Sequence, residues 1–112
     1  MNPLTHSYYS GASDAQIIYE TIGTYFDKIA HRHSTNPALV VRHQGINWTY
    51  GELQARVNRL ATGLIHLGIK AGDRVGIWGP NSSEWVLVQL ATAKIGAIMV
   101  CINPAYRLYE LE

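Results

Sequence analysis

The amino-acid sequence predicts an α/β fold that combines a β-hairpin, helices and a parallel β-α-β unit. Two short apolar stretches, residues 38–43 and 46–49, flank a glycine, as the strands of a hairpin do. A second stretch begins with a helix-start sequence and then repeats apolar residues every three or four positions. Between residues 74 and 102, a short apolar stretch, a helix-like stretch and another apolar stretch follow one another. This succession is typical of two parallel strands joined by a right-handed helical crossover.

Length and composition fit one domain with a balanced surface. The chain has 112 residues, with nine Lys and Arg against eight Asp and Glu and a net charge of +1. This balance provides no electrostatic footprint for nucleic acid and no polybasic segment for anionic lipid. No apolar stretch is continuous enough to cross a membrane, and the N-terminus resembles neither a secretory signal nor a transit peptide. Because the single cysteine rules out a disulfide framework within the chain, we expect a reducing, cytoplasmic location.

The first part of the chain predicts an irregular arm followed by a helix and the hairpin. Residues 1–20 show no apolar period and predict the arm. Residues 22–33 predict a helix with Thr21 as its N-cap. Its expected buried face carries Ile22, Phe26, Ile29 and Ala30. The hairpin follows, with Gln44-Gly45 as its expected turn.

Thr49 and Glu52 match a capping box, in which each residue bonds the backbone N–H of the other. The helix that follows is expected to end at Gly68, with Ile69 completing a Schellman motif. Its apolar residues predict one buried stripe, made of Leu53, Val57, Leu60, Leu64 and Leu67.

The predicted β-α-β unit comprises a strand at 74–79, a helix at 82–95 and a strand at 97–102. Asn81 with Glu84 resembles a second capping box. The helix is apolar on nearly every side, and the last strand is a continuous apolar run, so we expect that strand to be buried on both faces. Residues 106–112 predict another helix. The sequence stops within it, which indicates a truncated chain.

The turn between the first strand and the helix of this unit is a candidate anion site. Gly76 and Gly79 precede a helix start, where the backbone N–H groups of Asn81, Ser82 and Ser83 could bind a phosphate. The Walker lysine and the dinucleotide fingerprint are both missing, which favours an ordinary strand-to-helix turn. Ser82 and Ser83 also lack the Gly-x-Ser-x-Gly context of a nucleophile, and no histidine or acid can be assigned to them.

Other reactive side chains have structural explanations. His31 and His33 are two positions apart, so on a helix they diverge and do not form a metal-binding pair. Cys101 lies in an apolar run, where a buried thiol is inert. Without a basic surface, packing is a better explanation than base stacking for the tryptophans, which are Trp48, Trp78 and Trp85.

Asn103, Tyr106 and Arg107 remain as candidates for ligand contact. They follow the carboxyl end of a predicted parallel strand, the edge at which α/β proteins bind ligands.

Four consecutive segments resemble the first part of an AMP-forming acyl-CoA synthetase of the adenylate-forming superfamily. Trp48-Thr-Tyr-Gly-Glu-Leu53 resembles the first core motif of that family. Residues 72–85 resemble the strand-turn-helix that follows it. Residues 93–104 resemble the second core motif, and residues 105–112 resemble the next helix in the branch that activates fatty acids.

The resemblance implies the N-terminal part of the acyl-CoA synthetase-like fold, with residues 21–112 as a truncated portion of the AMP-binding synthetase/ligase domain. It implies a fatty acid–CoA ligase as the parent enzyme. Such an enzyme converts a carboxylic acid and ATP into an acyl-adenylate and pyrophosphate, and then transfers the acyl group to coenzyme A. Mg²⁺ would neutralise phosphate charge in the first step.

The sequence ends before the family's phosphate loop, its nucleotide-binding motifs and its catalytic lysines. No catalytic, cofactor-binding or metal-binding residue is therefore assigned, and we expect the chain alone to be inactive. Its expected partner is the rest of a synthetase chain, with fatty acid, ATP and coenzyme A as substrates of the whole enzyme. Unpaired strands also predict self-association. The alternative hypotheses are a complete small interaction module and a nucleotide-binding domain that uses Gly76 and Gly79.

Overall fold

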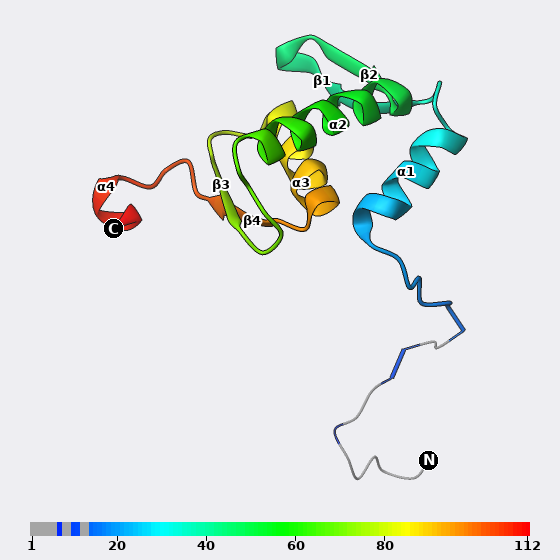
Figure 1. The fold of residues 1–112 in the computed structure, drawn as a ribbon, viewed down its shortest axis with the longest axis horizontal. Coiled ribbons are helices and arrows are strands. Elements are labelled where there is room, and N and C mark those ends of the chain that lie inside the picture. The colour runs from blue at the N-terminus through cyan, green and yellow to red at the C-terminus, as the bar shows by residue number, and fades with distance from the viewer. Residues whose placement is uncertain (1–6, 8–9, 12–13) are drawn as a thin grey trace.

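The computed structural model describes residues 7, 10–11 and 14–112 and confirms the predicted α/β fold (Figure 1). The part of the predicted arm at 1–6, 8–9 and 12–13 lies outside the described residues, and residues 14–20 form neither helix nor strand. The elements follow in the order α1 (Ile22–Arg32), β1 (Pro37–Val41), the 3-10 helix η1 (Arg42–Gln44), β2 (Ile46–Thr49), α2 (Tyr50–His66), β3 (Arg74–Trp78), α3 (Ser83–Ile95), β4 (Ile98–Ile102) and α4 (Leu108–Leu111).

The strands form two separate two-stranded sheets. β1 and β2 pair antiparallel, whereas β3 and β4 pair parallel with Arg74 opposite Ile98 and Trp78 opposite Ile102. α3 connects the parallel strands, as predicted. α2 and α3 pack side by side, and α1 contacts both of them (Figure 1). No helix in the described part of the chain combines the length and the apolar character that crossing a membrane requires.

The hairpin has a longer turn than the predicted Gln44-Gly45 pair. Val41 pairs with Ile46, and the residues between them form the 3-10 turn and the left-handed Gly45, whose φ is 66°. The N–H of Gly45 donates to the carbonyl of Arg42 at 3.1 Å. A two-residue type I′ turn needs a positive φ at both central positions, which glutamine adopts poorly. The longer turn avoids this cost at Gln44.

α1 begins at the predicted N-cap, because the Thr21 hydroxyl accepts from the N–H of Thr24 at 3.2 Å. Its buried face differs from the prediction: Ile22 is 65% exposed, and Gly23 is buried together with Phe26 and Ala30. A Cβ on Gly23 would lie 3.0 Å from the Cα of Lys94. The close approach of α1 to α3 at this glycine therefore turns Ile22 outward.

Both predicted ends of α2 are confirmed. The N–H of Glu52 donates to the Thr49 hydroxyl at 3.2 Å, and the N–H of Thr49 donates to the Glu52 carboxylate at 2.9 Å. At the other end, Gly68 has a φ of 91°, and the N–H of Ile69 donates to the Leu64 carbonyl at 3.1 Å. These bonds define a capping box and a Schellman motif.

The buried stripe of α2 is shorter than predicted. Leu53 and Val57 are buried and Leu60 is partly buried, but Leu67 is 81% exposed. Ala61 is buried instead, four positions after Val57, because α3 packs closely against that face. The core comprises Phe26, Ala30, Leu53, Val57, Ala61 and Ala91.

β4 is not buried on both faces, which corrects the prediction for residues 97–102. α3 covers one face of the β3–β4 sheet. On the other face Trp78 is 53% exposed, Ile98 is 48% exposed, and Val100 is also exposed. These three side chains form what we call the open sheet face.

A polar contact joins the three longer helices. The Lys94 ammonium of α3 donates to the Asp27 carboxylate of α1 and, at 2.6 Å, to the Asn58 side-chain oxygen of α2. Gln54 also donates to Asp27, at 2.7 Å. Partial burial acts to raise the pKa of Asp27, but the hydrogen bonds from Gln54 and Lys94 and the lysine charge together hold that pKa below its usual value.

Candidate functional site

The start of α3 is capped by Gln44 from the hairpin turn. The Gln44 side-chain oxygen accepts from the N–H of Ser83 at 2.8 Å, and its amide nitrogen donates to the Glu84 carboxylate at 3.0 Å. Ser82 occupies the N-cap position, but its side chain makes no capping bond. The predicted cap at Asn81 is therefore wrong, because the hairpin turn places a better acceptor at the helix end.

Negative charge already occupies this helix start. Hydrogen bonds from Gln44, from the backbone and from the Ser82 and Ser83 hydroxyls lower the pKa of the exposed Glu84 carboxyl to about 2. A phosphate would meet this carboxylate, and it would find the N–H of Ser83 already bonded. The geometry thus does not favour an anion site here, and it does not favour a serine nucleophile, because Ser83 is buried.

Of the two glycines before α3, Gly76 is closely packed, whereas Gly79 takes part through its backbone carbonyl. A Cβ on Gly76 would approach the Ile102 side chain to 3.2 Å. The carbonyl of Gly79 accepts from the Trp85 indole at 3.2 Å, and the carbonyl of Pro80 accepts from the same nitrogen at 2.9 Å. The two hydrogen bonds from Trp85 stabilise the turn between β3 and α3.

The remaining reactive side chains do not converge. His31 and His33 are exposed near the end of α1, and among residues 7, 10–11 and 14–112 no three His, Cys, Asp or Glu side chains gather as metal ligands would. Cys101, predicted to be buried, is exposed, because helix coverage of β4 is incomplete.

Asn103, Tyr106 and Arg107 lie on an exposed turn beyond β4. The structure brings Trp78 to this turn, because its indole donates to the Asn103 carbonyl at 3.1 Å. The Asn103 side-chain oxygen accepts from the N–H of Ala105 at 3.0 Å, and the N–H of Arg107 donates to Glu110 at 2.6 Å. The hydrogen bonds that these residues form stabilise the turn itself.

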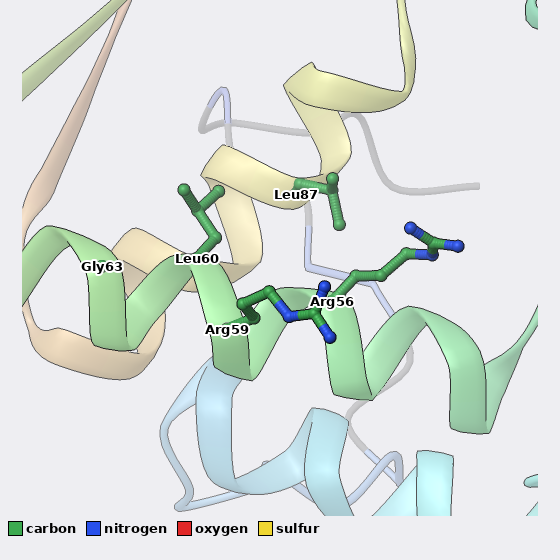
Figure 2. A pocket seen from close by; sticks show the side chains of 5 residues that line it. All are labelled: Arg56, Arg59, Leu60, Gly63 and Leu87. Carbon is green, nitrogen blue, oxygen red and sulfur yellow. The ribbon is translucent and has the colours of Figure 1, made fainter.

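A pocket between α2 and α3 was not identified from the sequence. It has a volume of about 350 Å³ and is lined by Arg56, Arg59, Leu60, Gly63 and Leu87. We call it the arginine groove. Figure 2 shows the two arginine side chains along α2 and Leu87 on the neighbouring helix. The arginines are three positions apart, a spacing that puts them on one face of a helix, but only the packing of α3 adds Leu87.

Residues 26–112 match the family model for AMP-binding enzymes. The chain belongs to this family. Over 106 aligned residues it is 45% identical to a mitochondrial medium-chain acyl-CoA ligase of Rattus norvegicus, an alignment that covers 95% of this chain and 17% of the relative. The chain thus spans about a sixth of the length of the curated relatives that it matches.

Solved structures of other proteins share the fold. A fatty acyl-CoA synthetase of Mycobacterium tuberculosis aligns with 81% of this chain and 18% of its own, with a TM-score of 0.78 and 34% identity. The N-terminal subdomain of NpsA from Klebsiella oxytoca aligns with 81% of this chain and 23% of its own, with a TM-score of 0.74 and 31% identity. The resemblance to the N-terminal part of acyl-CoA synthetases is therefore confirmed.

The described residues of this AMP-binding enzyme family member do not fit the phosphates of ATP at the start of α3, where Glu84 adds negative charge and Gln44 occupies the N–H of Ser83. The assignment of no residue of this chain to ATP, Mg²⁺ or coenzyme A stays a prediction from the sequence.

Proposed function

We propose that this chain forms the first structural part of a fatty acid–CoA ligase. The parent enzyme would convert a fatty acid and ATP into an acyl-adenylate and pyrophosphate, and would then transfer the acyl group to coenzyme A. The observation that carries the proposal is the 45% identity over 106 residues to the rat medium-chain ligase. The catalytic groups would come from the remainder of such an enzyme, and the chain alone would be inactive.

The open sheet face supplies the contact with that remainder. Trp78, Ile98 and Val100 expose apolar surface beside unpaired strand edges, which is the form of surface that another strand or helix covers. Because the carboxyl ends of β3 and β4 border this face, covering it would also order the turn that carries Asn103. The chain would thus support structurally a catalytic site that the remainder of the enzyme forms.

Reconstitution in trans tests this proposal. The chain is mixed with the rat ligase from which the matching segment has been removed, and formation of octanoyl-CoA and AMP is measured with octanoate, ATP, Mg²⁺ and coenzyme A. We expect activity from the mixture only. Val100→Lys on the open sheet face should abolish it, whereas Val40→Lys, at an exposed position of the hairpin, should leave it intact.

Two results would contradict the proposal. Release of pyrophosphate by the chain alone would show that it carries its own catalytic groups. Micromolar binding of ATP·Mg²⁺ to the chain alone, measured by calorimetry, would favour the nucleotide-binding alternative. The cytoplasmic location stays a prediction; the name of the rat relative places that protein in mitochondria.

A further inference from the structure

α4 presents apolar and acidic side chains to solvent. Leu108 is 79% exposed, Leu111 is 40% exposed, and the exposed Glu112 follows directly as the C-cap. Residues three and four positions apart share one face of a helix, so these three side chains lie on the same face. The Glu110 carboxylate accepts from the N–H of Arg107, whereas Glu112 forms no ion pair within the described part of the chain.

The arginine groove has the complementary chemistry. Arg56 and Arg59 are exposed, and among residues 7, 10–11 and 14–112 neither forms an ion pair. The guanidinium carbon of Arg56 lies 4.2 Å from the centre of the Trp48 ring, which restrains that side chain. Glu52 lines an adjoining pocket with both arginines, but its carboxylate already accepts from the N–H of Thr49.

Gly63 opens the apolar part of the groove. A Cβ on Gly63 would meet no atom within 4 Å, so the groove has room there for a side chain from outside. Arg59 and Gly63 are four positions apart, a rise of about 6 Å along the helix. Leu108 and Glu112 are separated by the same four positions. The charged and the apolar contacts therefore coincide when α4 runs antiparallel to α2.

We propose that the arginine groove binds α4 of a second copy of this chain. The Glu112 carboxylate would accept hydrogen bonds from Arg59, and Leu108 would enter the gap at Gly63. The occupant comes from another molecule, because α4 of the same chain lies beyond the end of β4 and away from α2 (Figure 1). A single arginine pair does not provide the larger basic cluster that a lipid surface needs.

This contact is distinct from association through the open sheet face, and the inference does not depend on the proposed ligase function. Sedimentation equilibrium of the Val100→Lys variant isolates it, because that change weakens the sheet contact. Association that depends on concentration should remain in this variant. Adding Arg59→Glu or Glu112→Arg should each weaken the remaining association about tenfold or more, because a charge-assisted contact becomes a repulsion.

Combining Arg59→Glu with Glu112→Arg in one chain provides the decisive comparison. The pair returns the net charge to that of the Val100→Lys variant and makes the groove and α4 complementary again, so association should be restored. Arg42→Glu combined with Glu112→Arg is the matched control, because Arg42 is an exposed arginine on the hairpin turn. This control has the same net charge and should associate as weakly as Glu112→Arg alone. Gly63→Leu should also weaken association by filling the gap.

Other results would overturn the inference. A monomeric Val100→Lys variant at the highest concentration would show that the open sheet face is the whole interface. Equal restoration by the Arg42→Glu control would show that net charge alone governs association. Weakening by Arg59→Glu but not by Glu112→Arg would identify a different acidic segment as the occupant. Should Gly63→Leu lose the native fold, the charge-reversal variants decide the outcome.

Discussion

Gln44 caps a helix that starts 39 residues later, through a bond of 2.8 Å from the N–H of Ser83 to its side-chain oxygen. The same amide donates to Glu84, so one side chain satisfies a backbone donor and holds a carboxylate at the positive end of α3. The hairpin turn and the β-α-β unit are therefore coupled, although they belong to different sheets.

Gln44→Ala should destabilise the fold by about 1–2 kcal/mol, because the buried N–H of Ser83 would lose its acceptor. The measurement is the free energy of unfolding in urea. Asn81→Ala is the matched control, and it should change that free energy by less than about 0.5 kcal/mol. Equal losses in the two variants would mean that Asn81 shares the capping role.

Acid should weaken the fold through Glu84. Its pKa is about 2 in the folded chain and 4.5 in the reference state. Because the folded value is the lower one, the stabilisation is complete above pH 4.5 and is lost as pH falls from 4.5 to 2. Glu84→Gln should reduce the slope of unfolding free energy against pH in this window. Some slope should persist, because the pKa of Asp27 is also lowered.

Glu112→Gln, at the exposed end of the chain, is the control for this pH series and should retain the original slope. A slope that is the same in Glu84→Gln and in the unchanged chain would show that the carboxylate does not stabilise α3.

Two of the helical glycines, Gly23 and Gly63, should respond oppositely to alanine. Gly23→Ala places a Cβ 3.0 Å from the Lys94 backbone and should cost about 1–3 kcal/mol through overpacking. Gly63→Ala meets open space and should stabilise the chain by about 0.5–1 kcal/mol. Thermal and urea unfolding of the pair would measure both effects. A stabilising Gly23→Ala would disprove the close α1–α3 contact.

The chain should self-associate through the open sheet face. Exposed Trp78, Ile98 and Val100 lie beside unpaired strand edges, and burying them removes apolar surface from water. Sedimentation velocity over a range of concentrations should show growing species. Val100→Lys should shift the distribution toward monomer, whereas Val40→Lys should not. A single monomeric species at the highest concentration would refute this expectation.

Features that depend on neighbouring residues were predictable from the sequence. The capping box of Thr49 and Glu52 and the left-handed Gly68 involve bonds that span only a few positions, so sequence spacing specifies them. The order of helices and strands was predictable for the same reason, because the spacing of apolar residues along the sequence indicates each element.

Features that depend on distant segments were not predictable in this way. Ile22 falls on the apolar side of its helix by spacing, but the close contact of Gly23 with Lys94 turns it outward. Asn81 is the better local cap, but Gln44 reaches the helix start from another sheet. The arginine groove likewise needs Leu87 from a second helix.

Lys94 also restricts how the helices can rotate. Its ammonium bonds Asp27 on α1 and Asn58 on α2, and its aliphatic stem lies against Gly23. Hydrogen bonds are directional, and a slip of one residue turns a helix face by about 100°. The contacts of Lys94 with two other helices therefore fix the rotation of each helix about its own axis. The small alanine side chains of the core alone would permit several such rotations.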